Sequence, residues 1–158
     1  MIRDQGKGIY DMEKLRHANS FRDLKVYSKA QAVAKIIFEA TKSFPREEMY
    51  SLTDQVRRSS RSIGAQIAEG WAKRQYKKHF ISKLTDADGE QQETQHWIDT
   101  AKDCGYLEQF QANKLNEDLS EIGRMLNSMI NKANLFCDQH SSEVRESSDD
   151  YSSLITDD

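Results

Sequence analysis

The sequence is poor in proline and glycine. One proline and seven glycines among 158 residues leave few breakers for the many tight turns that a β-sandwich or β-barrel needs. Hydrophobic residues make up 37% of the chain, which is enough for a buried core, and the length suits one domain. We therefore expect long helices around a single core.

Long apolar runs and cysteines are also scarce. No stretch approaches the roughly 20 apolar residues that cross a bilayer, and residues 1–10 contain no apolar run typical of a signal peptide. The two cysteines, Cys104 and Cys137, are too few for a disulfide framework or a cysteine-only zinc site. These absences predict a soluble cytoplasmic protein with no membrane partner.

Negative charge is concentrated at the C-terminus. Residues 138–158 hold seven acidic residues and a single basic one, Arg145, whereas the whole chain has a net charge of only −3. The rest of the chain is therefore net positive. The Ser- and Asp-rich composition of this segment cannot offset the entropy of ordering it. We expect an N-terminal extension over 1–20, a folded domain over 21–137 and a disordered acidic tail over 138–158.

Apolar residues recur at spacings of three and four in four segments. This periodicity predicts helices over residues 23–43, 52–70, 75–103 and 109–137. Pro45 ends the first segment, and Gly105 is typical of the stop after the third. The short link over 105–108 makes the last two helices an antiparallel hairpin. The predicted fold class is therefore all-α, an antiparallel up-down four-helix bundle with a tail at each end.

The apolar stripes of two segments are incomplete. The second segment has a thin apolar face, and the third is polar over residues 86–95. A monomeric bundle needs a continuous stripe on every helix, so these gaps indicate contacts shared with other subunits.

Positive charge gathers between residues 56 and 78, where the only acid is Glu69. The basic residues of this stretch are Arg57, Arg58, Arg61, Lys73, Arg74, Lys77 and Lys78. Arginine and lysine neutralise phosphates and release counterions, so the stretch predicts a site for RNA or DNA whose affinity falls with salt. The alternative is that these charges only solvate exposed helix faces and helix ends.

Two aromatic residues and one pair of opposite charges in this stretch have further interpretations. Trp71 and Tyr76 can stack on unpaired bases, but their size favours a place in the core. Arg58 and Glu69 are separated by close to three helical turns, so they can face one side of a helix and form a structural ion pair within or between subunits.

Catalytic machinery is not visible in the sequence. Glu93 and His96 form one Glu-x-x-His motif, whereas di-iron bundles use two such motifs and a Glu from each of the other helices. The histidines are scattered along the chain, and no Ser or Cys at a strained turn, as nucleophilic catalysis needs, stands beside them. We expect a protein that is not an enzyme and that binds no metal or cofactor.

Several short blocks resemble one known family in their order and spacing. The blocks are 21–27 (FRDLKVY), 44–45 (FP), 47–48 (EE), 52–60 (LTDQVRRSS), 67–70 (IAEG), 93–99 (ETQHWID) and 105–107 (GYL). Over residues 21–136 the chain resembles the bacterial four-helix-bundle family of 23S rRNA intervening-sequence proteins. The relatives of that family include the accessory variability proteins of diversity-generating retroelements. The chain departs from the family pattern at Gly64, where Pro is common, and at Ala65-Gln66, where Ser-Asn is common.

The resemblance implies an up-down four-helix bundle, a ring-shaped homopentamer and no established catalytic activity. For the retroelement relatives it implies binding of nucleic acid and of a reverse transcriptase through a basic surface. The resulting hypothesis is a non-enzymatic accessory protein whose partners are RNA or DNA, its own copies and a reverse transcriptase. The alternative is a structural oligomer or protein-interaction adaptor with no nucleic-acid role.

Overall fold

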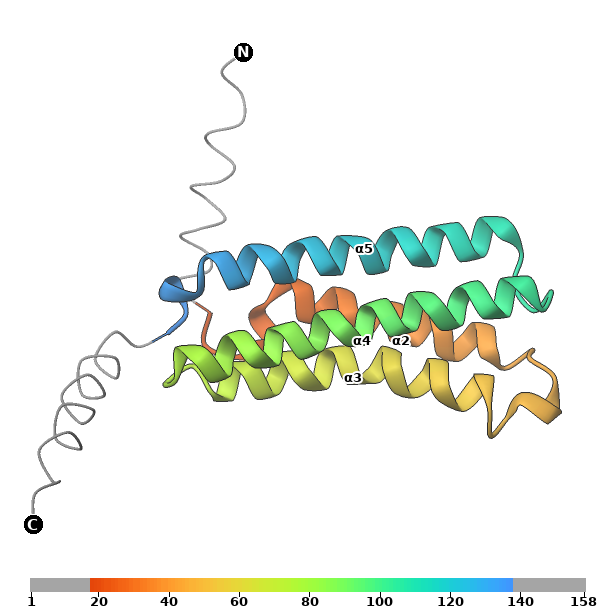
Figure 1. Cartoon of the computed structure of the whole chain (residues 1–158), viewed down its shortest axis with the longest axis horizontal. Coiled ribbons are helices and arrows are strands. Elements are labelled where there is room, and N and C mark those ends of the chain that lie inside the picture. Colours follow the sequence, from red (N-terminus) through yellow and green to blue (C-terminus); the bar gives the residue numbers. More distant parts are fainter. Residues whose placement is uncertain (1–17, 138–158) are drawn as a thin grey trace, which may run out of the picture.

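The computed structural model describes residues 18–137, and within them the chain forms four long helices and no strand (Figure 1). The helices are α2 (Lys25–Thr41), α3 (Leu52–Ala72), α4 (Lys77–Asp103) and α5 (Gln109–Asn131). Three short 3-10 turns accompany them: η1 (Phe21–Asp23), η2 (Arg46–Glu48) and η3 (Ala133–Leu135). Successive helices run in opposite directions, so the predicted all-α up-down bundle is confirmed. Most of the predicted N-terminal extension and the whole acidic tail lie outside the described residues.

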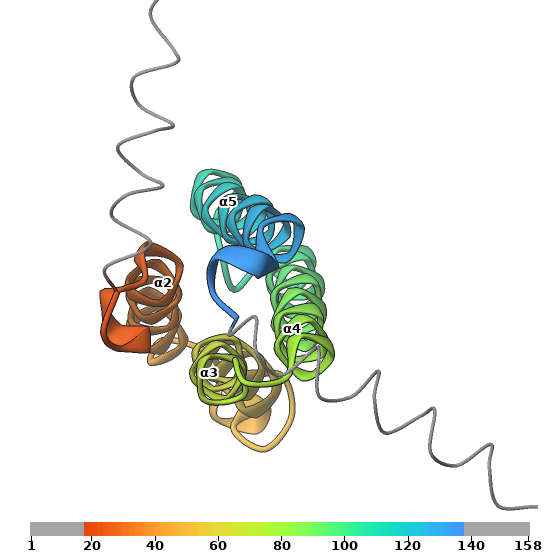
Figure 2. The same cartoon turned by 90° about the vertical axis from the view of Figure 1, so that its left-hand side faces the viewer.

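The four helices surround one hydrophobic core, with α5 beside α2 and α4 beside α3 (Figure 2). Each helix contributes fully buried side chains, among them Ile37, Ile63, Leu84 and Leu119. Burying an aliphatic side chain of this size stabilises the fold by about 1.5–3 kcal/mol. Every helix of the described part is too short or too polar to span a bilayer.

The first predicted helix begins later than expected. Residues before Lys25 form η1, where the Ser20 side chain accepts the Arg22 N–H over 3.2 Å and Asp23 accepts the Ser20 N–H over 3.1 Å. This capping box satisfies backbone donors before the helix starts. Asp23 therefore belongs to the preceding turn and not to α2.

The fourth predicted helix ends earlier than expected. Lys132 leaves the helical conformation with φ −108° and ψ 25°, and the chain continues as η3. This change of direction buries Ala133 and Phe136, and the Phe136 ring stacks on Phe80 with centroids 5.7 Å apart. The apolar repeat thus continues beyond the helix itself, because the turn carries it onto α4.

The stop after α4 is a glycine with a positive φ. Gly105 has φ 78°, and its N–H donates to the Lys102 carbonyl over 2.9 Å. The Tyr106 N–H donates to the Ala101 carbonyl over 2.9 Å, which completes a Schellman motif. The predicted helix stop is confirmed, and the turn that follows leads α5 back along α4.

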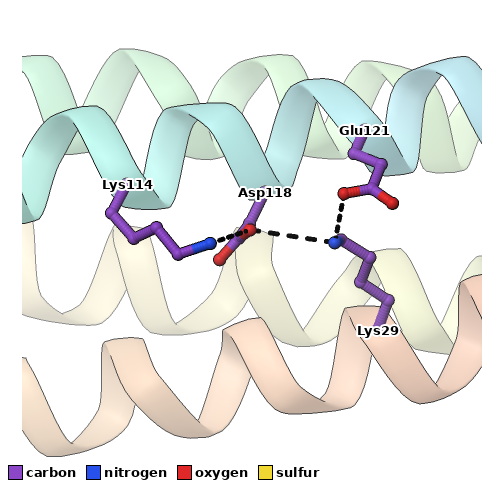
Figure 3. A network of polar contacts seen from close by, with 4 residues as sticks. All are labelled: Lys29, Lys114, Asp118 and Glu121. Atoms are coloured by element: carbon purple, nitrogen blue, oxygen red, sulfur yellow. Dashed lines mark hydrogen bonds and ion pairs between the residues drawn. The ribbon is translucent and has the colours of Figure 1, made fainter.

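A charged network joins the first and last helices (Figure 3). Lys29 of α2 lies between Asp118 and Glu121 of α5, with its Nζ 3.7 Å from Asp118 Oδ1 and hydrogen-bonded to Glu121. Asp118 also pairs with Lys114 over 2.8 Å, and this hydrogen bond raises the pKa of Lys114. The network fixes the side of the bundle where α2 meets α5.

Candidate nucleic-acid interface

The structure divides the basic stretch into separate groups. One group lies in the first half of α3 and contains Arg57, Arg58 and Arg61. The other lies at the junction of α3 and α4, and we call it the basic turn: Lys73, Arg74, Lys77 and Lys78. Arg61 and Lys73 are twelve residues apart, which corresponds to roughly 18 Å along the helix axis at a rise of about 1.5 Å per residue. The seven predicted residues are therefore not one continuous patch on a single chain.

Arg57 and Arg61 point toward α2, where they lie over the ring of Phe38. Their Cζ atoms are 4.8 and 5.6 Å from the ring centroid, and Lys42 Nζ is 4.9 Å from it. Arg57 Nε also donates to Thr41 Oγ1 over 2.8 Å. Lys42 was missed in the sequence because it precedes the basic stretch, although its spacing of four from Phe38 places both on one helix face. These cations already interact with groups of their own chain.

A groove of about 460 Å³ runs between α2 and α3 next to Arg61. Small residues form much of its wall: Ala30, Ala34, Gly64, Ala65 and Ala68. Among the described residues that line it, the charged ones are Lys35 and Arg61. Small side chains let another helix approach closely, so the groove suits helix packing better than phosphate binding.

Arg58 faces carboxylates. Its side chain is 72% exposed, and its Nη1 lies 3.7 Å from Asp54 Oδ2. Across from it on α4, burial and the charge of Glu93 raise the pKa of Glu90, and the charge of Arg58 opposes that rise. Arg58 therefore compensates an acidic surface, which disfavours phosphate binding there.

Glu69 is paired with Lys83 and not with Arg58. Lys83 Nζ lies 2.9 Å from Glu69 Oε2, between α4 and α3. The hydrogen bond and charge of Lys83 lower the pKa of Glu69, and Lys73 adds a smaller effect. The Arg58–Glu69 ion pair considered from the sequence does not form within the chain. The only acid of the basic stretch is thus already neutralised.

The basic turn is the uncompensated part of the stretch. Lys73, Lys77 and Lys78 are exposed, and none of them forms an ion pair with another residue of the described range. The Arg74 guanidinium is held against Trp71, with Cζ 3.6 Å from the ring centroid and Nε donating to the Trp71 carbonyl over 2.9 Å. Trp71 is 8% exposed, so its predicted place in the core is confirmed.

Tyr76 does not belong to the core, contrary to the expectation. It is the N-cap of α4 with φ −121° and ψ 102°, so it precedes the helical seam that Phe80 begins. Its side chain is 39% exposed, and its ring centroid lies 5.5 Å from that of His79. Exposed rings between lysines are an arrangement found where proteins bind single-stranded nucleic acid.

The Glu-x-x-His motif has a structural use. Glu93 accepts a hydrogen bond from Trp97 Nε1 over 3.2 Å, and the His96 ring lies 4.7 Å from that of Trp97. Across residues 18–137, no three His, Cys, Asp or Glu side chains gather in a way that could hold a metal ion.

The polar middle of α4 has partners inside the chain. The Thr94 hydroxyl is fully buried and lies 2.9 Å from the hydroxyl of Ser59 on α3. Gln91, which is also buried, donates to Asp88 over 3.0 Å and accepts from Gln95 over 2.7 Å. Within this part of α4, these hydrogen bonds satisfy the buried side chains of Gln91 and Thr94 inside the chain.

A family model and a solved structure are similar to this chain. Residues 22–128 match the family model described as 23S rRNA-intervening sequence protein, which covers most of the bundle. A crystal structure from Bacteroides thetaiotaomicron, of a protein with unknown function from the S23 ribosomal protein family, is similar to this chain. The two share 31% identity with a TM-score of 0.61, over 67% of this chain and 95% of the other. No curated protein matches the chain.

Proposed function

The chain belongs to the 23S rRNA-intervening sequence protein family, and on that premise we propose that it is a non-enzymatic accessory protein that binds RNA or DNA through its basic turn. The observation that carries this proposal is the set of three exposed lysines, Lys73, Lys77 and Lys78, which have no ion pair among the described residues. When such lysines neutralise the phosphates of a nucleic acid, the counterions held around those phosphates are released, and this release contributes to the affinity.

The parts of the basic turn favour single-stranded segments. The lysines act as point charges for phosphates, whereas the Arg74 fork is held in one orientation by Trp71 and can donate to two phosphate oxygens. The exposed rings of Tyr76 and His79 offer faces on which unpaired bases can stack. None of these contacts reads a base edge, so we propose binding without a fixed sequence.

We further propose a homopentamer, as the resemblance implies. The groove of small residues between α2 and α3, with Ile36 49% exposed on α2, supports close packing against another copy. A ring would bring several basic turns together and strengthen their field. Native mass spectrometry tests this step: we expect five times the chain mass of 18.3 kDa, and a native mass equal to one chain would contradict it.

We propose a reverse transcriptase as the protein partner of this basic surface, in the cytoplasm. The support is the resemblance to retroelement accessory proteins together with the uncompensated charge of the basic turn. Co-expression of the chain with a retroelement reverse transcriptase tests the step. A complex is expected to survive purification at low salt, and its absence would leave nucleic acid as the proposed partner.

A binding titration with matched variants tests the main proposal. Fluorescence anisotropy of labelled single-stranded and duplex RNA and DNA is followed from low to physiological salt. The test variant is Lys73→Gln with Lys77→Gln and Lys78→Gln. The control removes the same charge elsewhere, with Arg46→Gln, Lys102→Gln and Arg124→Gln, none of which pairs with an acid in the described part of the chain.

The salt dependence separates the outcomes. Losing three phosphate contacts lowers the slope of log affinity against log salt by about 2 for single strands. We expect this loss in the test variant and little change in the control. An equal loss in both variants would contradict the location, and no binding of the unaltered protein at low salt would contradict the function.

The second candidate function is a protein-interaction adaptor, which the opposite end of the bundle favours. There, three large apolar side chains are exposed: Met49 by 47%, Tyr50 by 92% and Phe110 by 72%. Exposed aromatic residues are enriched at protein interfaces. Loss of a protein partner after Tyr50→Ser and Phe110→Ser, with no effect of the lysine variant on nucleic acid, would favour the adaptor.

A further inference from the structure

The basic turn shares its end of the bundle with the last described residues of the chain. Figure 1 shows η3, in blue, at the end where α3 leads into α4. Phe136 is buried there, and its ring stacks on Phe80, which lies one helical turn after Lys77. The last described residue, Cys137, therefore lies near the first turn of α4.

Two acidic side chains of the described residues at this end, Asp23 and Glu69, already have partners. Asp23 accepts the N–H groups of Asn19 and Ser20 over 2.9 and 3.1 Å. Glu69 is paired with Lys83 over 2.9 Å. The basic turn therefore keeps its positive charge, and an anionic group that approaches it meets no competing acid from these two positions.

The chain that follows Cys137 has the complementary charge. Residues 138–158 carry seven acids and only one basic residue, Arg145. The acids are Asp138, Glu143, Glu146, Asp149, Asp150, Asp157 and Asp158. An extended segment of this length reaches up to about 70 Å, far more than the short path from Cys137 to the basic turn requires. A short tether of this kind gives an effective concentration on the order of millimolar.

We propose that residues 138–158 occupy the basic turn of their own chain and compete there with nucleic acid. The competition rests on the proposed function, whereas the contact itself does not. A nucleic acid must displace this segment to bind, so weak polyanions such as mononucleotides and short oligonucleotides are excluded. Long or clustered phosphate arrays, which release more counterions, displace it. The segment thereby sets a minimum charge density that a nucleic acid must have to bind the basic turn.

Zero-length cross-linking of the full chain tests the contact without nucleic acid. A carbodiimide joins a carboxylate to a lysine amine only where the two touch. We expect links from the acids of 138–158 to Lys73, Lys77 or Lys78, and their loss in high salt. The Glu69–Lys83 pair provides the internal control, because it should cross-link in the same sample. A Glu69–Lys83 link without tail links, or tail links spread evenly over all lysines, would overturn the proposal.

Isotope mixing tests whether the contact is made within one chain. Chains of natural abundance and 15N-labelled chains are mixed in the unfolded state, refolded together and cross-linked. Links between peptides of the same label support the proposal. Links between a labelled tail and an unlabelled basic turn, at the frequency expected for random pairing, would overturn the assignment to the same chain.

A full-length variant tests the competition. Its seven tail acids are changed to the matching amides, so the chain keeps its length. We expect the affinity for a short single-stranded RNA to rise about tenfold at low salt, which is the gain from removing a competitor with an effective concentration on the order of 1 mM and a Kd of about 0.1 mM for the basic turn. The gain should vanish in the Lys73→Gln, Lys77→Gln, Lys78→Gln background. The control changes acids outside the tail, Glu47→Gln, Asp103→Asn and Glu117→Gln, and an equal gain there would contradict competition at the basic turn.

The cross-linking and the binding titration together separate failure of the inference from failure of the proposed function. If cross-links to residues 138–158 form but neither the unaltered protein nor the tail variant binds nucleic acid, then the contact is supported and the nucleic-acid function is contradicted. If nucleic-acid binding depends on the basic turn, but no cross-links to residues 138–158 form and the tail variant gains no affinity, then the function is supported and the inference is overturned.

Discussion

The hydroxyl of Tyr106 donates a hydrogen bond to Glu48 Oε1 over 3.2 Å, joining the turn after α4 to the loop before α3. The other oxygen of Glu48 accepts the N–H of Leu52 at the start of α3, also over 3.2 Å. Burial of the hydroxyl, together with the hydrogen bond and the charge of Glu48, raises the pKa of Tyr106. One carboxylate therefore holds both connections at this end of the bundle.

Tyr106→Phe is expected to destabilise the bundle. The substitution keeps the ring beside Phe44 and removes only the hydrogen bond to Glu48. We expect the midpoint of thermal unfolding to fall by about 2–4 °C. Tyr50→Phe is the control, because Tyr50 is 92% exposed and should show no change. Equal midpoints for the two variants would show that the Glu48 bond contributes nothing.

A Gly→Ala substitution is expected to change the unfolding free energy in opposite directions at Gly89, inside α4, and at Gly105, in the turn that ends α4. A Cβ added at Gly105 or at Gly89 meets nothing within 4 Å, so packing does not decide the effect. Gly105 has φ 78°, and Gly105→Ala should cost about 1 kcal/mol of unfolding free energy. Gly89 lies inside α4, and Gly89→Ala should gain up to about 1 kcal/mol. Urea denaturation measures both, and a stabilised Gly105→Ala variant would contradict the role of the turn.

The buried Thr94–Ser59 hydrogen bond is expected to appear as coupling between α4 and α3. Thr94 is fully buried and Ser59 is 3% exposed. Thr94→Val should cost about 1–2 kcal/mol, because the Ser59 hydroxyl loses a partner that water cannot replace. Thr94→Val combined with Ser59→Ala should cost less than the sum of the single changes. A double-mutant cycle with additive effects would show that the two hydroxyls do not interact in the folded protein.

The architecture follows from local patterns, which is why the sequence predicts it well. The apolar residues that recur at spacings of three and four in the segment 109–137 include Leu115, Leu119, Ile122 and Leu126, and all four are buried. Helix ends are harder to predict because they depend on contacts made elsewhere. The end of α5 depends on the packing of Phe136 against Phe80, a contact between residues far apart in the sequence.

The candidate site was less predictable from the sequence because a count of charges along the chain does not show the direction in which each side chain points. Each helical residue turns by about 100°, so Arg57 and Arg58 point to different neighbours although they are adjacent. Arg57 meets Thr41 of α2, whereas Arg58 meets Asp54 and the acids of α4. The turn between α3 and α4 keeps its three lysines together, and none of them forms an ion pair with another described residue.

The effect of Glu90 on stability is predicted to depend on pH. Burial and the charge of Glu93 raise its pKa above the ordinary value of 4.5. The folded state then binds this proton more readily than the unfolded state, so ionisation of Glu90 opposes folding. The loss of stability develops as pH rises through 4.5 toward the raised folded pKa, and it is complete above that pKa. Below 4.5 the carboxyl is neutral in both states and the loss disappears.

Glu90→Gln should therefore stabilise the protein at pH 7 and leave it unchanged near pH 3, the lower limit being set by the ordinary carboxyl pKa. Arg58→Gln should destabilise it at pH 7, because the Arg58 charge favours ionised Glu90, and this effect should shrink in the Glu90→Gln background. Thermal unfolding at the two pH values measures both, with Glu117→Gln as the control for general loss of negative charge. If Arg58→Gln instead leaves stability intact and weakens binding of nucleic acid, then Arg58 belongs to the binding surface and not to the acidic face of α4.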